Sequence, residues 1–329
     1  MARAMLGRSS TTVGFWLAAL LGVSLLFGSS SFHVGQRPEA GGSAGPQGIA
    51  ASAAPGDNGA TVFVSVAGEK GTPVTDLTRN DFVVQENGKP REVLEVTKAV
   101  SVPLLLGVVV DTSGRAKDAM REEDQFRVLY GFLNESLQRS DAAFLVAAGQ
   151  ESDIVTDVTN NPAAWLSGLK ELAAAKRRGS AAIWDAIDLC SLASPPGAPA
   201  RRVVIAVSDF QDNASKQTLD ETIREAQRTG MTVFALQEPG LLASKGEWNR
   251  AKHDAERIAG ETGGAFFDVP SPRELAASLE RIRLLLQDSY VLRYRPVAQP
   301  AEPQPAELRI KVSHRHCTVF APARRASSP

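Results

Sequence analysis

From residue 103 onward, predominantly apolar stretches alternate with segments whose apolar residues recur at helical spacing. Such apolar stretches are typical of strands that are buried on both faces of a sheet. They cover residues 103–110, 142–148, 201–209 and 231–237, with shorter ones at 153–156 and 265–269. The helical spacing predicts helices at 117–139, 161–174, 182–192, 218–228, 248–261 and 272–286. This alternation predicts an α/β fold, whose central and mainly parallel sheet carries helices on both faces.

Segments in which apolar and polar residues alternate one by one flank this region on both sides. One covers residues 61–68, and two more within 81–96 meet at Asn87-Gly88, a residue pair typical of a tight hairpin turn. After the last predicted helix, residues 289–296 and 307–314 alternate again. Three strands alone make a thin core. We therefore expect the N- and C-terminal strands to form one small β-domain, into which the α/β region is inserted.

The N-terminal residues have the pattern of an export signal. Arg3 and Arg8 precede the apolar stretch 13–27, and small residues follow at 28–31. The stretch is shorter than the roughly 20 residues of a membrane-spanning helix, although its retention as an uncleaved anchor stays open. Residues 32–60 are rich in Gly, Ala, Pro and Ser and predict a disordered linker.

These patterns divide the chain into consecutive parts. A signal peptide or N-terminal anchor at 1–31 and the linker at 32–60 precede a β-strand region at 61–100. The α/β domain follows at 101–287, and the C-terminal strands and tail occupy 288–329. We expect an exported protein that is periplasmic, secreted or at the cell surface, and tethered to the membrane if the N-terminal segment is retained.

The overall composition argues against several partners. The chain has 329 residues, with 36 Lys and Arg against 37 Asp and Glu, so no basic surplus attracts nucleic acid or anionic lipid. We expect membrane contact only through the N-terminal segment. Of the two cysteines, Cys190 falls in a predicted helix and Cys317 near the C-terminus, and we expect two separate thiols.

Acidic residues follow two of the predicted buried strands. Asp111 ends the stretch that begins at residue 103, and Asp209 ends the stretch that begins at residue 201. Parallel sheets bind ligands at the carboxyl ends of their strands, near a topological switch point. Ser113 follows Asp111 by two residues, a spacing that suits a magnesium site, but Arg115 occupies the next position where a hydroxyl would help.

Three short segments occur in order along the α/β region: "DTSGR" at 111–115, "GSAAIWDAI" at 179–187 and "SDFQD" at 208–212. With these segments the chain resembles a von Willebrand factor type A (VWFA) domain protein, of the secreted bacterial VWFA-related group. Residues 71–90 and 288–296 resemble the flanking β segments of that group, so the resemblance covers residue 61 to the C-terminus. It implies a Rossmann-like A domain that recognises partners rather than catalysing a reaction.

The resemblance also implies a metal-ion-dependent adhesion site. In the family, Asp-x-Ser-x-Ser on one loop, a Thr on a second and an Asp on a third hold a magnesium ion, whose coordination a carboxylate of the partner completes. Asp111 and Ser113 match the first loop and Asp209 matches the third. These three residues are therefore the candidate ligands for a weakly bound Mg²⁺, and no other cofactor is expected.

The chain departs from the family pattern at the remaining positions. Arg115 replaces the second Ser, and Ala181 stands where the Thr belongs, so Ser180 serves only if its loop shifts by one residue. Phe210 replaces the small residue that usually follows the Asp, and Asp212 adds a carboxylate nearby. The predicted adhesion site is thus degenerate.

Three interpretations of Arg115 stay open. Turned inward, its guanidinium lies between Asp111 and Asp209 and replaces the charge of the metal. Turned outward, it leaves these residues and Ser113 to hold magnesium weakly. In the third interpretation the site is vestigial, and Asp111 caps the turn that follows it.

Other chemistry has little support in the sequence. The four histidines, at positions 33, 253, 314 and 316, lie in no motif with Ser113 or Ser208, which argues against a Ser-His-Asp hydrolase. His314, His316 and Cys317 fall short of a closed zinc shell and fit the polar face of an edge strand better. No catalytic residue is therefore predicted.

We expect an exported, non-enzymatic protein-binding or adhesion module. Its partner, a protein or another extracellular polymer, would contact the loop edge of the sheet. The predicted contact residues are Asp111, Ser113, Arg115, Ser180 and Asp209. The alternative is a structural or assembly component of the cell envelope with an inert, vestigial site.

Overall fold

The computed structural model describes residues 59–113, 119–174, 179–193, 201–240, 244–297 and 305–325, with the backbone alone described at 119–123. The predicted signal or anchor, nearly all of the linker, and Arg115 lie outside these residues. Within them, no helix is long and apolar enough to cross a membrane.

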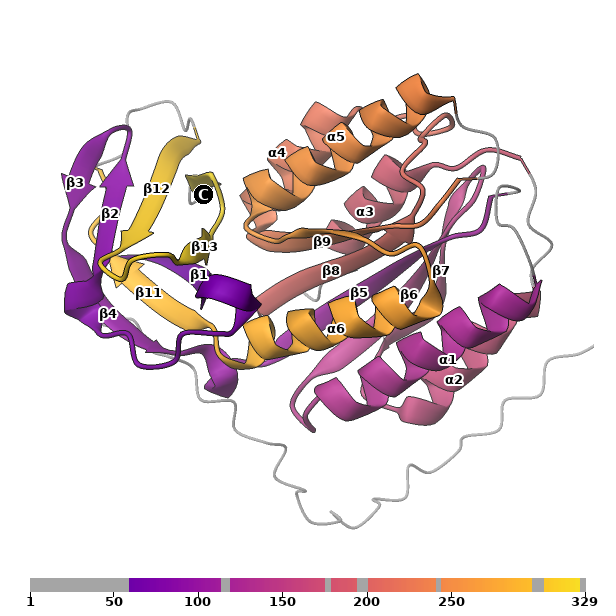
Figure 1. Cartoon of the computed structure of the whole chain (residues 1–329), viewed down its shortest axis with the longest axis horizontal. Coiled ribbons are helices and arrows are strands. Elements are labelled where there is room, and N and C mark those ends of the chain that lie inside the picture. The colour runs from indigo at the N-terminus through magenta and orange to yellow at the C-terminus, as the bar shows by residue number, and fades with distance from the viewer. Residues whose placement is uncertain are drawn as a thin grey trace, which may run out of the picture. The chain divides into compact units, whose positions relative to one another are not determined.

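A six-stranded sheet forms the centre of the α/β domain, in the order β10-β9-β8-β5-β6-β7 (Figure 1). Its strands are β5 (Leu104–Asp111), β6 (Ala142–Ala148), β7 (Ser152–Thr159), β8 (Arg201–Ser208), β9 (Met231–Gln237) and β10 (Phe266–Asp268). All neighbouring strands are parallel except β7, which runs antiparallel to β6 at one edge. The predicted Rossmann-like α/β fold class is confirmed.

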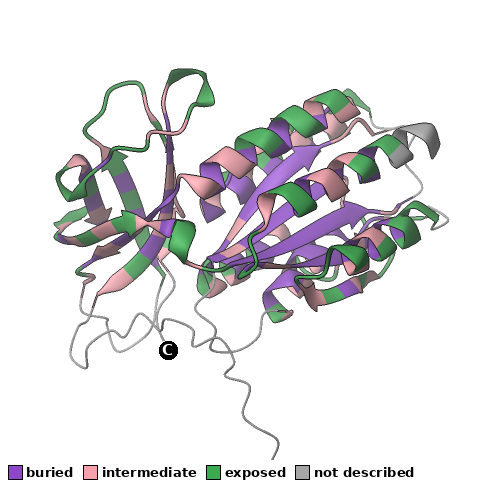
Figure 2. Ribbon diagram, turned by 90° about the horizontal axis from the view of Figure 1, so that it is seen from below, coloured by how far each residue is buried: buried purple, intermediate pink, exposed green. Residues whose placement is uncertain are grey.

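Helices cover both faces of this sheet (Figure 1). They are α1 (Ala119–Ser136), α2 (Pro162–Ala174) and α6 (Pro272–Gln287) on one face, and α3 (Ile183–Leu192), α4 (Leu219–Thr229) and α5 (Lys245–Thr262) on the other. The side chains of β5 alternate between the two cores: Val108 packs with the first group of helices and Val109 with the second. A strand buried on both faces therefore has an unbroken apolar sequence, and Figure 2 shows these central strands as buried.

The flanking strands form two further sheets of four strands each, β13-β1-β11-β4 and β14-β12-β2-β3. They are β1 (Ala60–Ala67), β2 (Phe82–Glu86), β3 (Lys89–Arg91), β4 (Val93–Lys98), β11 (Tyr290–Tyr294), β12 (Ala306–Val312), β13 (Thr318–Phe320) and β14 (Arg324–Arg325). The C-terminal β11 lies between β1 and β4, and β12 pairs with β2. N- and C-terminal segments thus share one core, which includes Val64, Val84 and Leu292.

Several contacts attach the β-domain to the α/β domain. Ser65 Oγ in β1 donates a hydrogen bond of 2.9 Å to the carbonyl of Leu285 in α6. The amide of Ala323 donates to the carbonyl of Glu261 at 3.0 Å. Next to that contact, a Cβ built on Gly263 would lie 2.6 Å from the backbone nitrogen of Pro322, so only glycine allows this close approach.

The observed elements differ from the predicted ones mainly at their ends. α5 begins at residue 245 rather than 248, because Ser244 and Glu247 form a capping box around its first turn. The predicted strand at 307–314 ends at Val312, and the next residues form a turn in which His316 has a φ of 59°. The expectation that His314 and His316 lie on a strand is therefore wrong.

Candidate functional site

Asp111 and Asp209 lie at the carboxyl ends of neighbouring central strands. Asp111 is the last residue of β5, and Asp209 follows the last residue of β8. From β5 the chain passes to β6 and β7 on one side, and then returns to β8 on the other. The topological switch point therefore lies between β5 and β8, where open α/β sheets bind ligands. The structure thus places the two predicted acidic residues beside this point.

The carboxylate of Asp111 connects the two strand ends. Ser208 Oγ donates a hydrogen bond of 2.6 Å to Asp111 Oδ2, and the amide of Ser113 donates to Oδ1 at 2.8 Å. Asp111 is 7% exposed and Ser113 is 1% exposed, so these hydrogen bonds are shielded from water. Asp111 therefore stabilises the turn after β5, which the vestigial interpretation of the site predicts, and it also fixes the end of β8.

Asp209 is held by its own loop. Gln211 donates its backbone N–H to Asp209 Oδ1 at 2.9 Å and its side-chain amide to Oδ2 at 3.0 Å. Gln237 Nε2, from the end of β9, donates to the carbonyl of Asp209 at 3.2 Å. A Cβ on Gly240 would lie 2.6 Å from Asp209 Oδ2, so the loop after β9 packs closely against this carboxylate.

Phe210 occupies a backbone conformation that favours glycine. Its φ is 57°, in the left-handed region, where side chains with a Cβ are strained. Its ring is 2% exposed, and the ring centroid lies 6.2 Å from that of Trp184 in α3. Burial of the phenyl ring offsets the backbone strain, which accounts for a large apolar side chain at this position.

The loop before α3 carries the predicted Thr position. Ala181 occupies it and is 1% exposed, and its amide donates to Asn213 Oδ1 at 3.0 Å. Its carbonyl accepts the backbone N–H of Asn213 at 3.1 Å, and the amide of Ala182 donates to Gly149 O at 2.7 Å. These contacts fix the backbone on both sides of Ala181, whose methyl group offers no ligand. Ser180 is half-buried just before this fixed segment.

Asp212, the additional carboxylate noted in the sequence, has a structural partner. Its Oδ2 accepts the backbone N–H groups of Ile183 at 2.7 Å and Trp184 at 3.2 Å, at the start of α3. A carboxylate in this position satisfies amides that have no partner within the helix, and it complements the helix dipole. Asp212 therefore joins the third loop to the second and stabilises the beginning of α3.

Three polar residues beside the site were not predicted from the sequence. Gln125 in α1 is 5% exposed and donates to Glu238 Oε1 at 2.7 Å. Gln237, at the end of β9, is fully buried next to Asp209. A signal was present for two of them, because Gln237 ends a predicted buried stretch and Glu238 follows it, much as Asp111 and Asp209 mark the ends of theirs.

A hollow of about 250 Å³ lies beside this edge, between α5 and the loop that follows Asp209. Trp184, Phe210 and Asp212 contribute to one side, and Glu247 and Asp254 of α5 contribute to the other. Burial raises the pKa of the Asp254 carboxyl above its usual value. Arg250 of α5 also lines the hollow, so its charged lining consists of three carboxylates, from Asp212, Glu247 and Asp254, and one guanidinium.

A divalent cation would find an incomplete set of donors here. Asp111, Ser113 and Asp209 are present, but Ala181 supplies no oxygen from its side chain. Among the residues that the structure describes, no three His, Cys, Asp or Glu side chains are grouped as metal ligands. Magnesium prefers six oxygen ligands in near-octahedral geometry. The described residues therefore do not fit a complete adhesion site, and Arg115 lies outside them.

The histidine turn likewise gathers no metal ligands. His314 Nδ1 lies 3.8 Å from Asp81 Oδ1, and His316 Nδ1 lies 3.5 Å from Glu69 Oε1, so the two rings face different carboxylates. Cys190 is remote in sequence and buried in α3, where burial raises the pKa of its thiol. Cys317 is half-buried near the turn.

No known family model matches the chain, and no curated protein matches it. Solved structures do match. The vWF domain of the type V pilus tip protein Mfa5 from Porphyromonas gingivalis is 12% identical, with a TM-score of 0.45, over 55% of this chain and 94% of that one. The SpRpn10 VWA domain is 14% identical, with a TM-score of 0.40, over 54% and 93% of the two chains.

A third similar structure is proximal thread matrix protein 1 from the mussel byssus, with zinc in its adhesion-site motif. It is 15% identical, with a TM-score of 0.48, over 62% of this chain and 50% of that one. The first two of these structures are named as vWF or VWA domains. At these identities and TM-scores the likeness concerns the arrangement of sheet and helices only.

Proposed function

We propose that this chain is an exported, non-enzymatic protein-binding module, whose partner is a protein or another extracellular polymer. The partner docks at the carboxyl edge of the central sheet. The proposed contact residues are Asp111, Ser113, Arg115, Ser180 and Asp209. The observation that carries the proposal is the position of Asp111 and Asp209 at the carboxyl ends of β5 and β8, beside the switch point.

The charges at this edge define the partner chemistry that we propose. Asp111 and Asp209 put two carboxylates at neighbouring strand ends, and Glu247 and Asp254 line the hollow beside them. Acidic groups around an indentation attract basic groups, so a lysine or arginine of the partner suits this edge. Arg115 adds a fixed positive charge next to them, which suits one acidic group of the partner in bidentate geometry.

We propose that docking does not depend on a tightly bound divalent cation. Support comes from Ala181, whose methyl group replaces a ligand, and from the hydrogen bonds that already engage Asp111 and Asp209. The non-enzymatic part of the proposal is supported by the partners of Ser208. A serine nucleophile needs an adjacent base that takes its proton. The hydroxyl of Ser208 instead donates a structural hydrogen bond to Asp111 and accepts one from the amide of Phe210.

A structural role in assembly of the cell envelope is the second candidate. The observation that favours it is that all four carboxylate oxygens of Asp111 and Asp209 accept hydrogen bonds from the chain itself. In that role the acidic residues hold the three loops together, and a partner binds elsewhere. The two candidates differ in whether a partner contacts the loop edge beside Ser180.

Site-specific photo-crosslinking in the exporting cell distinguishes the two candidates. A photoreactive residue placed at Ser180 is expected to give a discrete cross-linked product, and the same residue placed at exposed Val83 of β2 is not. Asp209→Asn is expected to abolish the product, whereas Asp157→Asn on the exposed part of β7 leaves it intact. Equal products from both positions, or a product that survives Asp209→Asn, would rule out docking at this edge.

A further inference from the structure

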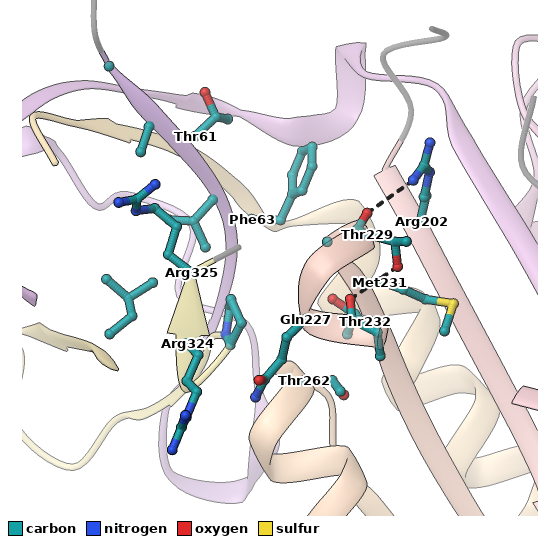
Figure 3. A pocket seen from close by; sticks show the side chains of 17 residues that line it. Thr61, Phe63, Arg202, Gln227, Thr229, Met231, Thr232, Thr262, Arg324 and Arg325 are labelled. Carbon is teal, nitrogen blue, oxygen red and sulfur yellow. Dashed lines mark hydrogen bonds between the residues drawn. The ribbon is translucent and has the colours of Figure 1, made fainter. Parts of the chain in front are cut away.

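A cavity of about 410 Å³ lies at the opposite, amino-terminal edge of the central sheet, between the α/β domain and the β-domain. One wall comes from residues 59–63, which include the start of β1, and the other comes from the end of α4 and the start of β9 (Figure 3). Cavities of roughly 300–1,000 Å³ between domains are the usual place for small-molecule ligands. This cavity is remote from Asp111 and Asp209, which follow the carboxyl ends of their strands.

Three arginines give the cavity a positive charge. Arg202 of β8, Arg324 and Arg325 of β14 line it, and none of its lining residues is Asp or Glu. Figure 3 shows Arg325 on one side, Arg202 on the other and Arg324 below. Within the described part of the chain, neither Arg202 nor Arg324 forms an ion pair with a carboxylate. Arg202 donates one hydrogen bond of 3.1 Å, to the carbonyl of Thr229 at the end of α4.

Arg325 is fixed from behind by a buried carboxylate. Its Nε donates to Glu86 Oε1 at 2.6 Å, and Glu86 is fully buried. Arg91 Nε lies 3.8 Å from Glu86 Oε2, so two guanidinium groups face this one carboxylate. Burial raises the pKa of the Tyr294 hydroxyl, which stays neutral and donates to Glu86. Glu86 therefore positions Arg325 and balances only part of the positive charge around the cavity.

The remaining lining is apolar on one side and carries hydroxyl groups on the other. Phe63, Met231 and Leu308 supply apolar surface, and Thr61 and Thr232 supply hydroxyls. The labelled side chains in Figure 3 show Phe63 and Met231 near Arg202. A ligand that fits this lining has an anionic group and an apolar part.

We infer that this cavity binds a small organic anion. Its carboxylate, sulfonate or phosphate group is held by Arg202, because a guanidinium presents a planar pair of N–H donors to such oxygens. Arg324 lies on the far side of the cavity from Arg202 and adds positive charge there (Figure 3). Its apolar part lies against Phe63 and Met231. Since the ligand contacts both domains, its binding stabilises the docked arrangement of the β-domain. This site is independent of the docking edge under Proposed function.

Fluorescence titration of the full chain with anilinonaphthalene sulfonate tests the inference. This probe has one anionic group on an apolar body, and N-phenyl-naphthylamine is its uncharged counterpart. The variant Arg202→Gln is expected to weaken binding of the sulfonate by about tenfold or more, because the charge-assisted hydrogen bonds to the sulfonate oxygens are lost. Binding of the uncharged amine is expected to change little.

Matched variants keep the test decisive. Arg281→Gln removes an exposed arginine of α6 outside the cavity and is expected to leave the affinity unchanged. Arg324→Gln removes an exposed positive charge on the far side of the cavity and is expected to weaken binding less than Arg202→Gln does. Thr61→Trp fills the cavity and is expected to abolish binding. Unaltered affinity in Arg202→Gln, equal weakening by Arg281→Gln, or equal binding of the sulfonate and the amine would overturn the inference. Asp209→Asn is expected to leave probe binding intact, which separates this test from that of the docking edge.

Discussion

Ser208 Oγ donates a hydrogen bond of 2.6 Å to Oδ2 of Asp111, across the point where the chain changes direction in the sheet. The same hydroxyl accepts the amide of Phe210 at 2.9 Å. One side chain therefore satisfies a buried carboxylate and a buried amide at once. We expect this serine to determine the stability of the whole loop edge.

Ser208→Ala tests that role. The substitution leaves Asp111 and the amide of Phe210 short of a partner in a buried environment, and each such loss costs about 1–3 kcal/mol. We expect the free energy of unfolding to fall by about 2 kcal/mol or more in urea denaturation. Ser101→Ala, at an exposed hydroxyl, is expected to change it by no more than about 0.5 kcal/mol. Equal effects of the two variants would refute the role of Ser208.

Substitutions at Phe210 separate backbone strain from ring burial. Phe210→Ala and Phe210→Gly both lose the buried ring, but only glycine accepts the φ of 57° freely. We expect Phe210→Gly to be more stable than Phe210→Ala by about 1 kcal/mol, and both to be less stable than the unaltered chain. At Ala235, inside β9, glycine is expected to be less stable than alanine. The same order at both positions would contradict strain at residue 210.

Two glycines near the end of α5 make a matched pair. Gly263→Ala places a Cβ 2.6 Å from Pro322 N at a φ of 87°, so we expect the β-domain to lose its close contact with α5. The predicted loss of stability is about 2 kcal/mol or more. Gly260→Ala meets nothing within 4 Å and is expected to stabilise α5 by about 0.5–1 kcal/mol. Thermal unfolding of the two variants measures the difference, and a stable Gly263→Ala variant would contradict the contact.

Asp81 gives the β-domain a defined response to acid. Hydrogen bonds from the backbone and side chain of Thr78, and a further one from Ser313, lower the pKa of Asp81 to about 2. Because the pKa in the folded state lies below that in the unfolded state, the stabilisation is present above about pH 4 and is lost as the pH falls to about 2.

Unfolding measurements across that pH range test this response. We expect Asp81→Asn to unfold with a weaker dependence on pH between 4 and 2 than the unaltered chain, because the titrating group is gone. Asp76→Asn, at an exposed carboxylate of the same domain, serves as the control. A pH dependence that Asp81→Asn leaves unchanged would exclude Asp81 as its source.

Calorimetric titration with Mn²⁺ and Mg²⁺ tests whether the adhesion site is degenerate. We expect no micromolar binding to the unaltered chain, because Ala181 and Arg115 replace two oxygen ligands of the family pattern. The double variant Arg115→Ser/Ala181→Thr restores both hydroxyls and is expected to bind more tightly, with Asp209→Asn abolishing the gain. Micromolar binding by the unaltered chain that Asp209→Asn removes would show a functional metal site.

The fold was largely predictable because its central strands are buried on both faces. An unbroken apolar stretch such as that of β5 is typical of a strand that is buried on both faces. Predicted helices between successive stretches of this kind are typical of a parallel sheet that is covered on both sides. The short strands β13 and β14 escaped prediction, since two or three residues carry too little periodicity to be recognised. β7 also proved longer than predicted, because its exposed positions interrupt the apolar pattern.

The candidate site was only partly predictable. Asp111 and Asp209 are marked by their places after buried strands, so the sequence locates them. The use of Asp212 as a cap for the amides of Ile183 and Trp184 depends on how the second and third loops meet. Such contacts join residues far apart in the chain, and a single sequence does not record them.

The pairing of β1 with β11 has a consequence for the order of folding. Ala60 lies opposite Tyr294 in this pair, so β1 cannot pair with β11 until more than half of the chain has been synthesised. The inserted α/β domain closes its own sheet with contacts that are nearer in sequence. Closure of long loops slows the pairing of distant strands. We therefore expect the α/β domain to fold first and to bring the two ends of the chain together, so that the β-domain is the last part to form. Until then, the unpaired edges of β1 and β4 are where a newly made chain is most open to aggregation or to a chaperone.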